Sequence, residues 1–385
     1  MMQHIRQEER PMNKKLINEK LDLVMDKLMN LDGPEIKTDK AVAPEEMKKG
    51  MYARDFGIRE WDWPQGVGLY GLLQLQAARG TREYDAFLLE WVENNLQIGL
   101  PSANINTTAP FLTLFELTGR YEKPAWEKLC RERADYLVQG LPKTQWGGFE
   151  HVTSGSTDRN DVNRNPEQLW ADTLFMAVLF LGKMGVRYGN QAWIDEAVYQ
   201  YLIHIQYLAD HRTGLLYHGW TFLERSHFGG IFWNRGNSWF TMGAVAFLRA
   251  MEGQISAADK RFILSAWQNQ ARALLSVQDA GGLWHTVLTN PDTYIETSGS
   301  GAITAGLLAG IRYGYLDQDF LPAAKKAVEA LLNYIGEDGT VGSVSAGTSM
   351  GMDEQHYKDI LIRPMAYGQS LAALALTEAL YWAEE

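Results

Sequence analysis

Six times along the chain, a short polar or tryptophan-rich cluster leads directly into an apolar segment rich in small residues. The clusters lie at 63–66, 104–108, 168–172, 233–239, 297–301 and 365–370. Their spacing of about 40 to 70 residues indicates one structural unit repeated around or along an axis. Polar groups at the starts of buried helices would all face one end of such a fold. We therefore expect the functional site at that end.

Six amphipathic segments alternate with these apolar ones. Each has one apolar stripe and many charges, which is typical of a helix with one face in water; they cover 15–29, 83–96, 124–139, 191–209, 257–278 and 321–335. The apolar segments should be buried on most sides; they cover 67–77, 109–117, 174–181, 240–250, 302–311 and 371–380. Six outer and six inner helices predict an all-α fold, the (α/α)6 toroid or six-hairpin barrel. An open α-solenoid is the alternative, but its units usually run about 34–47 residues, and most intervals here are longer.

Four long segments carry the extra length of the repeats, and each leads into an inner helix. They cover 141–167, 212–232, 280–297 and 336–364 and are rich in Gly, Asn, Ser and aromatic residues. Loops of this length in a compact domain usually have a function. We expect them at the same rim as the polar clusters, with short strand pairs such as 215–220 and 282–285. Residues 1–14 are predicted to be a loose N-terminal segment, 32–50 to be loose or laid on the surface, and 15–385 to be one catalytic domain.

Charge and composition disfavour several classes of protein. The net charge of −11 over 385 residues leaves no basic stripe to neutralise phosphates, so we expect no nucleic-acid partner. The single cysteine, Cys130, excludes an intramolecular disulfide. No apolar run reaches the length of about 18 residues that a membrane span needs, and residues 1–11 are polar and lack the apolar core of a signal peptide. We therefore expect a cytoplasmic protein without membrane contact; the oligomeric state stays open.

Tryptophans gather where the polar clusters are. Eight of the 13 lie in the predicted loops or at the starts of inner helices: Trp61, Trp63, Trp146, Trp170, Trp220, Trp233, Trp239 and Trp284. A flat aromatic face with a polar tip suits the apolar face of a sugar ring. Any one of them could equally be a core residue, but eight at one rim favour a sugar-binding site.

Asp172 is the strongest candidate for a catalytic group. It lies where polar sequence gives way to an apolar helix, and residues 165–167 look like the better helix start. That would place its carboxylate inside the first turns, facing the cavity among aromatic residues. Partial burial should raise its pKa, which suits a proton donor near neutral pH. The alternative is an ordinary N-cap.

Two arginines are candidates for holding a substrate carboxylate. Arg235 has the guanidinium fork that holds a carboxylate, and Arg164 is a second candidate. Arg235 could instead form a salt bridge to a rim aspartate such as Asp172 or Asp62. His218 lies between Tyr217 and Trp220 and leads into the fourth cluster. It is either a functional group or a hydrogen-bonded structural residue.

The sequence predicts neither a metal nor a cofactor. His204, His211 and His218 are evenly spaced, but they bridge a helix and a loop, and no carboxylate or cysteine completes a ligand set. The chain has no phosphate-binding loop, no dinucleotide fingerprint and no serine-nucleophile elbow.

Several of these clusters, taken in order, resemble the motifs of glycoside hydrolase family 105, the unsaturated rhamnogalacturonyl hydrolases. More distantly they are similar to family 88, the unsaturated glucuronyl hydrolases. The matching stretches are Trp-Pro-Gln-Gly-Val-Gly-Leu-Tyr at 63–70, Asn-Ile-Asn-Thr-Thr-Ala-Pro at 104–110, Gln-Leu-Trp-Ala-Asp-Thr-Leu-Phe-Met at 168–176, Tyr-His-Gly-Trp at 217–220 and Trp-Asn-Arg-Gly-Asn-Ser-Trp at 233–239. The resemblance runs from about residue 15 to the end of the chain.

This resemblance implies an unusual mechanism. Polysaccharide lyases leave a sugar with a C4=C5 double bond at the non-reducing end, and the family hydrates that vinyl ether. An aspartate protonates C4, water deprotonated by the same group adds at C5, and the resulting hemiketal opens and releases the aglycone. Carried over, Asp172 is the acid and base, whereas direct hydrolysis needs two carboxylates.

The resemblance also implies which residues bind the substrate, an unsaturated oligosaccharide. His218 and Arg235 would contact the unsaturated uronate, with Trp233 and Trp239 packed on it. Asn106 stands where family 88 has an aspartate, which favours family 105 and implies that Asn106 orients substrate or water. The remaining expected substrate-binding residues are Trp63, Thr107, Arg164, Trp170 and Asn237.

Other functions are compatible with the same toroid. An unsaturated glucuronyl hydrolase acting on glycosaminoglycan or other lyase products would share the site. A two-carboxylate inverting glycosidase would need a second acid, and an epimerase would need two opposed histidines. A non-catalytic sugar-binding toroid would keep the aromatic residues but would not need Asp172.

Overall fold

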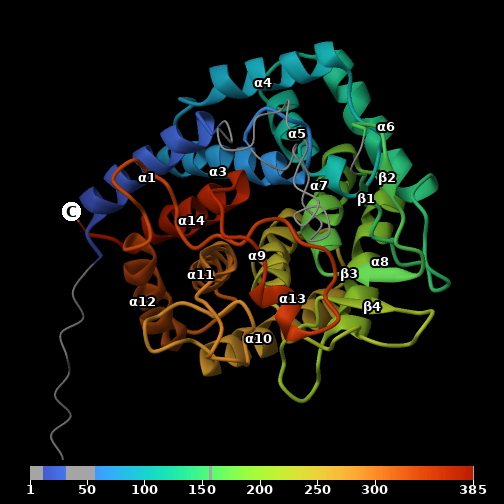
Figure 1. Ribbon diagram of the computed structural model, residues 1–385. Coiled ribbons are helices and arrows are strands. Elements are labelled where there is room, and N and C mark those ends of the chain that lie inside the picture. Colours follow the sequence, from blue (N-terminus) through green and yellow to red (C-terminus); the bar gives the residue numbers. More distant parts are fainter. Residues whose placement is uncertain (1–11, 32–56, 156–157, 385) are drawn as a thin grey trace, which may run out of the picture.

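Six inner helices form a closed ring in the computed structural model, which describes residues 12–31, 57–155 and 158–384 (Figure 1). They are α3 (Trp63–Arg79), α5 (Phe111–Thr118), α7 (Leu179–Tyr188) with the π-helical turn η3 (Leu174–Val178) before it, α9 (Asn234–Ala250), α11 (Thr297–Arg312) and α14 (Ala366–Ala379). Each contacts the next in this order, and α14 contacts α3. Because the last inner helix packs on the first, the predicted (α/α)6 toroid is confirmed and the open solenoid is not formed.

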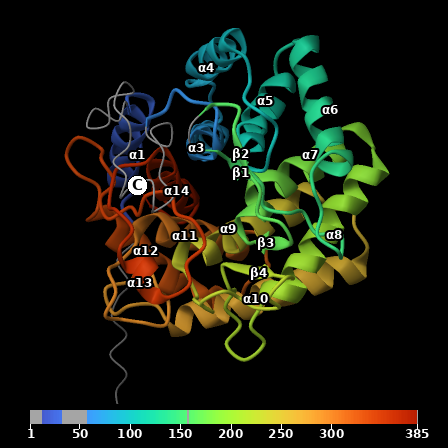
Figure 2. The ribbon, with the colours of Figure 1, turned by 45° about the vertical axis from the view of Figure 1, so that its right-hand side comes forward.

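Six outer helices surround this ring (Figures 1 and 2). They are α1 (Lys14–Met29), α4 (Asp85–Ile98), α6 (Pro124–Gln139), α8 (Gln191–Leu208), α10 (Ala257–Ser276) and α12 (Leu321–Leu332). Each packs on an inner helix through its apolar stripe; α1, for example, buries Leu21, Val24 and Leu28 against α14. Among the described residues, no helix is long and apolar enough to cross a membrane.

The first residues that the structure describes pack on the core and pair with the C-terminal end of the chain. Met12 is buried in the core, and the side chain of Asn13 caps α1 by accepting a hydrogen bond from the Leu16 amide. The backbone of Asn13 forms a bridge with Glu384. Residues 12–14 are therefore packed. The rest of the predicted loose segments, 1–11 and 32–50, lies outside the described residues.

Short strands and helices occupy the long rim segments. β1 (Thr153–Ser154) pairs with β2 (Val162–Asn163), and β3 (Gln168–Trp170) pairs with β4 (Gly219–Thr221), both antiparallel. The shorter helices are η2 (Asn106–Thr108), η4 (Gln318–Phe320) and α13 (Glu354–Lys358). The expected strand at 215–220 is thus shifted toward 219–221, and 282–285 forms only an isolated bridge between His285 and Ile295. The first expectation is therefore met only in part, because the strand pairs with β3 about fifty residues earlier in the chain, and the second strand is not formed.

Close approach between α11 and α14 depends on Gly301. A Cβ atom at this position would lie 2.7 Å from the carbonyl oxygen of Leu371 and 3.0 Å from the amide of Ala372, both backbone atoms of α14. We predict that Gly301→Ala lowers the free energy of unfolding by about 1–3 kcal/mol, the usual cost of overpacking a core. Urea denaturation measures the change.

Gly243 provides the matched control, because it lies in the middle of another inner helix. A Cβ atom there would meet only ordinary contacts, the nearest being the Tyr201 hydroxyl at 3.4 Å. Gly243→Ala should be neutral or stabilising by up to about 1 kcal/mol, since alanine favours helix more than glycine. Equal effects of the two substitutions would contradict the close approach of α11 and α14.

Candidate active site

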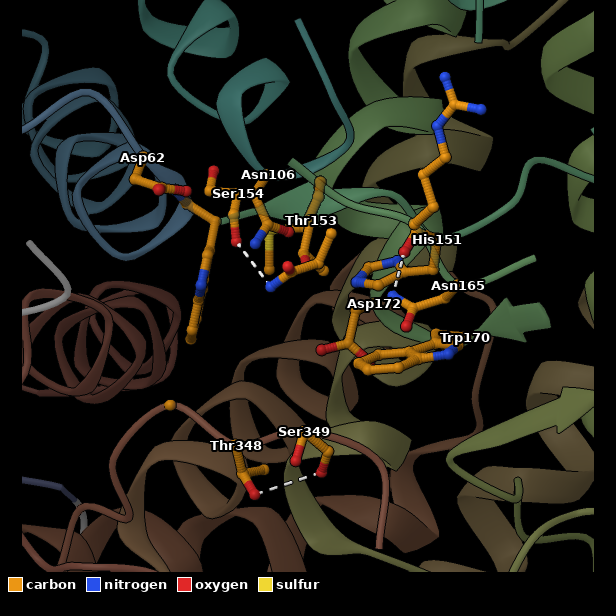
Figure 3. Close-up of a pocket in the computed structure, with 15 residues that line it drawn as sticks. Asp62, Asn106, His151, Thr153, Ser154, Asn165, Trp170, Asp172, Thr348 and Ser349 are labelled. Carbon is orange, nitrogen blue, oxygen red and sulfur yellow. Dashed lines mark hydrogen bonds between the residues drawn. The ribbon is translucent and has the colours of Figure 1, made fainter. Parts of the chain in front are cut away.

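A cavity of about 360 Å³ lies at the end of the toroid where the inner helices begin (Figure 3). This volume is in the range of small-ligand sites, about 300–1,000 Å³. The cavity is lined by Asp62, Trp63, Asn106, His151, Thr153, Ser154, Asn163, Arg164, Asn165, Trp170, Asp172, Met176, Gly347, Thr348 and Ser349. These residues come from the starts of α3, η2 and η3 and from the rim segments before α7 and α14.

Asp172 lies between a strand and a wide helical turn. β3 ends at Trp170, and the π-helical turn η3 follows from Leu174. Such turns are frequent at functional sites. The helix start expected at 165–167 is wrong, because pairing of β3 with β4 delays the helix until Asp172. In the described part of the chain, the Asp172 carboxylate accepts no backbone hydrogen bond, so it does not cap its helix.

His218 is the nearest polar neighbour of Asp172. Its Nε2 atom lies 3.3 Å from Asp172 Oδ2. Neither atom has another hydrogen-bond partner within the described ranges. The His218 side chain is buried, whereas that of Asp172 remains 16% exposed. The carboxylate can therefore reach a ligand in the cavity while one of its oxygens faces the imidazole.

The pKa of Asp172 is lower than the sequence suggests. Burial raises this pKa, but His218, together with the fields of His151 and Arg235, outweighs burial and holds it below the usual aspartate value. The expectation of a raised pKa was wrong because the charged and ring neighbours come from distant segments. Asp172 is therefore ionised at neutral pH in the free protein.

His151 lies beside Asp172 in the lining and stacks on Trp170, with ring centroids 4.4 Å apart and planes at 13° (Figure 3). Its Nδ1 atom is 2.8 Å from the Thr173 hydroxyl. Burial lowers the pKa of His151 to about 4, so the ring is neutral at neutral pH. A neutral imidazole here can bond a water molecule or a sugar hydroxyl.

The predicted binding residues fall into two groups. Trp63, Asn106, Arg164 and Trp170 line the cavity together with Asp172. Trp63 is held by stacking on Tyr367, with centroids 4.6 Å apart. The second group is not part of the lining and consists of Thr107, His218, Trp233, Arg235, Asn237 and Trp239, all of them buried.

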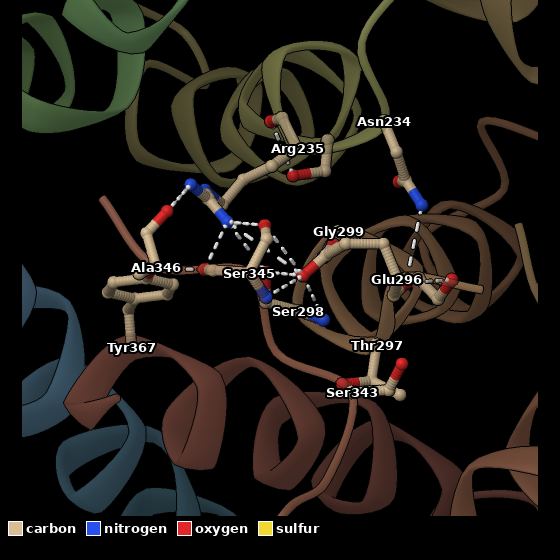
Figure 4. A network of polar contacts seen from close by, with 12 residues as sticks. Asn234, Arg235, Glu296, Thr297, Ser298, Gly299, Ser343, Ser345, Ala346 and Tyr367 are labelled. Carbon is tan, nitrogen blue, oxygen red and sulfur yellow. Dashed lines mark hydrogen bonds and ion pairs between the residues drawn. The ribbon is translucent and has the colours of Figure 1, made fainter. Parts of the chain in front are cut away.

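Arg235 lies inside a buried polar network (Figure 4). Its guanidinium donates hydrogen bonds to the carbonyl oxygens of Ser345 and Ala346, both at 2.8 Å, and to the Ser345 hydroxyl. Glu296 lies 3.8 Å away and is fully buried. That carboxylate also accepts hydrogen bonds from the amides of Gly299 and Ser345. The carboxylate beside Arg235 is thus Glu296, not Asp172 or Asp62. The network holds the chain directly before the lining residues 347–349.

Thr107 and Asn237 also make structural hydrogen bonds. Thr107 Oγ1 donates to the Ser102 carbonyl oxygen at 2.9 Å and accepts from Arg133 at 3.0 Å. Asn237 pairs through its side-chain amide with both backbone groups of Leu216 at 2.8 Å. It therefore fixes the segment that leads to His218. Trp239 stacks on Phe175 and meets Trp63 edge-on.

Apart from Arg164, the lining residues that lie in the long rim segments were not predicted as site residues; they are His151, Thr153, Ser154, Asn163, Asn165, Gly347, Thr348 and Ser349. They lie in the long rim segments 141–167 and 336–364, whose length was the only available signal. Asp62 was considered from the sequence only as a salt-bridge partner for Arg235. The side chain of Asp62 caps α3 by accepting a hydrogen bond from the Trp63 amide at 2.8 Å.

Comparison with known proteins shows the family to which the chain belongs. The family model for glycosyl hydrolase family 88 matches residues 40–382. The unsaturated rhamnogalacturonyl hydrolase YesR of Bacillus subtilis is 32% identical over 337 residues, which cover 87% of this chain and 93% of YesR. The chain belongs to glycoside hydrolase family 105, which is related to family 88.

Solved structures agree with this family 105 assignment. A possible family 105 member from Salmonella enterica has a TM-score of 0.88 and 31% identity over 99% of this chain and 97% of its own. The unsaturated glucuronyl hydrolase of Bacillus sp. GL1 shares the fold, with a TM-score of 0.67 and 18% identity over 94% of this chain and 96% of its own. The predicted family is therefore confirmed, and the chain is a glycoside hydrolase.

Proposed function

We propose that this family 105 protein releases a 4,5-unsaturated uronic acid from the non-reducing end of a small oligosaccharide. The substrate is an unsaturated galacturonyl residue linked to rhamnose, as in rhamnogalacturonan fragments. The name of YesR, to which the chain is similar over most of its length, supports this substrate. The observation that carries the proposed chemistry is one carboxylate, Asp172, that faces the cavity and caps no helix.

Among the described residues, the carboxylates that line the cavity favour hydration of the double bond over direct hydrolysis. Both Asp62 and Asp172 line the cavity. Asp62 is only 2% exposed, and its side chain accepts the Trp63 amide, so it is engaged in capping α3. Direct hydrolysis needs one carboxylate on each side of the scissile bond. Hydration of a vinyl ether needs one group that gives a proton to C4 and removes one from water, and Asp172 can supply both steps.

In this proposal, Asp172 becomes protonated when the substrate binds. Asp172 is ionised in the free protein because His218 lowers its pKa. The uronate brings a second negative charge into the same cavity, and a nearby like charge raises the pKa of a carboxyl group. Asp172 then takes up a proton as the substrate binds. After C4 is protonated, the ionised Asp172 accepts a proton from water as that water adds to C5.

The size of the site fits a short ligand. A cavity of about 360 Å³ accommodates a small oligosaccharide end rather than a polymer chain. We therefore propose an unsaturated disaccharide as substrate; the cytoplasmic location stays a prediction from the sequence.

Loss of ultraviolet absorbance from the conjugated double bond tests the function. Purified protein is incubated with an unsaturated rhamnogalacturonan disaccharide and, in parallel, with a glycosaminoglycan-derived unsaturated disaccharide. We expect loss of absorbance with the first. Loss with the second alone would make the protein an unsaturated glucuronyl hydrolase, and loss with neither would contradict the proposal.

A second carboxylate introduced at position 106 should oppose substrate binding. Asn106 lines the cavity. Asn106→Asp places a negative charge where an anionic sugar binds, so we predict that KM at neutral pH rises roughly three- to tenfold. The increase should shrink as the pH falls toward about 4, the usual pKa of an aspartate, because the new group then becomes neutral. Steady-state kinetics across this pH range measures the effect.

Asn106→Ala is the control for the loss of the amide alone. It introduces no charge, so its effect on KM should not diminish at low pH in this way. If the two variants have the same KM at every pH, the uronate carboxylate does not bind near position 106.

A further inference from the structure

His218 has one polar neighbour on each ring nitrogen. Nε2 faces Asp172 Oδ2 at 3.3 Å, and Nδ1 lies 2.8 Å from the hydroxyl oxygen of Tyr357. The ring is packed against Trp170 and Trp233, with centroids 5.3 and 4.4 Å away. Because the ring is buried between these groups, the proton on a neutral His218 can reside only toward Tyr357 or toward Asp172.

The hydrogen bonds of Tyr357 decide between these two positions. Its hydroxyl oxygen accepts a hydrogen bond from the Gly351 amide at 3.1 Å, which leaves the hydroxyl proton free to be donated. Met350 Sδ, at 3.9 Å, is a weak acceptor, whereas an imidazole nitrogen at 2.8 Å is a strong one. Burial holds the pKa of Tyr357 well above its usual value, so the phenol keeps its proton. Tyr357 therefore donates to Nδ1, and the neutral ring carries its own proton on Nε2.

Gly351 makes this arrangement possible. A Cβ atom at Gly351 would lie 2.7 Å from a ring carbon of Tyr357 and 2.6 Å from one of His356. Only glycine therefore lets the backbone amide come within hydrogen-bond distance of the hydroxyl.

Tyr357 belongs to the same rim segment that forms one wall of the cavity. Gly347, Thr348 and Ser349 line the cavity, and Tyr357 follows in α13. Arg235 holds this segment at Ser345 and Ala346. The cavity wall and the hydrogen bond to His218 thus depend on one piece of chain.

We propose that Tyr357 is a positioning residue that fixes the tautomer and orientation of His218, so that His218 presents Nε2–H to Asp172. The role rests on the proposed function of Asp172 as acid and base. Segment 345–357 carries Tyr357, so the position of this segment determines the hydrogen bond to Nδ1. That hydrogen bond in turn determines how strongly His218 stabilises the ionised Asp172. A wall segment that is out of place would leave Asp172 without its oriented donor.

Other titratable groups face this pair and enter its pH dependence. The pKa of Asp172 depends on His151 and Arg235 in addition to His218. His218 in turn affects the pKa values of His356 and His151 electrostatically. Burial lowers the pKa of both His151 and His356, so at neutral pH the permanent positive charge among these neighbours is that of Arg235.

Nuclear magnetic resonance tests the tautomer without any substrate. The full chain, labelled with ¹⁵N in its eight histidines, is studied by long-range ¹H–¹⁵N correlation, and His218 is assigned with His218→Gln. We expect an unprotonated Nδ1 whose shift is that of a hydrogen-bond acceptor. Tyr357→Phe, which keeps the ring but removes the hydroxyl, should move this signal toward the value of a free nitrogen. A protonated Nδ1 in the neutral ring, or a signal unchanged by Tyr357→Phe, would overturn the proposal.

Kinetics of the same variant tests the consequence for Asp172. With a weaker donor on Asp172, the pKa of this carboxyl rises, so the decline of kcat/KM with increasing pH should move to higher pH. We expect kcat to fall about tenfold, less than the roughly 10²-fold or greater loss expected for a group that transfers the proton itself. KM should stay within about threefold, because Tyr357 is not part of the cavity lining.

Tyr294→Phe is the matched control, because the Tyr294 hydroxyl donates to the backbone carbonyl of Tyr357 at 3.2 Å and supports the same segment. It should leave both the Nδ1 signal and the pH profile in place. If both variants shift the profile equally, the effect comes from loosening the segment and the proposal is wrong. If the nuclear magnetic resonance result holds but no unsaturated sugar is turned over, the proposed function fails while the role of Tyr357 in orienting His218 stands.

Discussion

Asp172→Asn is expected to lower kcat on an unsaturated rhamnogalacturonyl disaccharide by about 10²-fold or more, the usual contribution of general acid–base catalysis. The amide has the shape of the carboxyl group but can neither give nor accept the proton. Binding should persist, because the cavity and its aromatic walls are unchanged, and isothermal titration with the uncleaved substrate measures it. Retained binding with lost turnover would locate the defect in the chemical step.

We predict that kcat/KM of the wild type falls as the pH rises. The form of Asp172 that protonates C4 is the acid, and the pKa of this group is lowered in the free protein. Its protonated fraction therefore decreases as the pH rises, so kcat/KM should decline from mildly acidic toward alkaline pH.

Asp62→Asn is the control for the other carboxylate in the cavity lining. Asparagine caps helices about as well as aspartate, so the cap on α3 is retained and stability should change little. We expect kcat within about tenfold of the wild type, well above the level of a variant that lacks its general acid. If Asp62→Asn is as inactive as Asp172→Asn, two carboxylates share the chemistry and direct hydrolysis becomes the better account.

Arg235→Met should have the largest effect on stability. The guanidinium is 1% exposed and lies beside the fully buried Glu296. Removing one partner of a buried ion pair leaves an uncompensated charge, which costs about 3–5 kcal/mol. The variant also loses the hydrogen bonds that hold Ser345 and Ala346. We expect a loss of this size in the free energy of unfolding, measured by urea denaturation.

Two further variants test the cause of this loss. Arg249→Met, in the same helix, breaks a pair with Glu252 whose side chains are 42% and 52% exposed, and should cost no more than about 1 kcal/mol. Adding Glu296→Gln to Arg235→Met removes the stranded charge, so the double variant should lose less than the sum of the two single changes. A stable Arg235→Met protein with a strongly raised KM would contradict the structural role and support the sequence-based expectation that Arg235 contacts the substrate.

The helical ring could be predicted from the sequence because its cause is local. An amphipathic stripe such as that of α1 and an all-round apolar segment such as α11 each reveal their burial within one stretch of chain. Closure followed from the number and spacing of the repeats. The strand pairs could not be placed in the same way, since β3 meets β4 about fifty residues later in the sequence.

The site could be predicted only in part, for the same reason. Asp172, Trp63 and Asn106 stand at the starts of inner helices, so the repeat itself predicts that they meet. The environment that sets the pKa of Asp172 comes instead from His218, His151 and Arg235, which lie on separate segments. Arg235 resembled a substrate ligand because its chemistry suits a carboxylate, but the carboxylate beside it is Glu296 in the core. The residue type predicted that Arg235 lies beside a carboxylate, but only the fold shows that this carboxylate belongs to Glu296.

The most direct test of double-bond hydration compares two disaccharides that differ only in the C4=C5 bond. One is the unsaturated galacturonyl-rhamnose unit, and the other is its saturated counterpart. Release of rhamnose from each is followed by chromatography, together with the ultraviolet absorbance of the first. Our account predicts that only the unsaturated sugar is cleaved, with one double bond lost for each rhamnose released. Cleavage of both sugars at similar rates would contradict it.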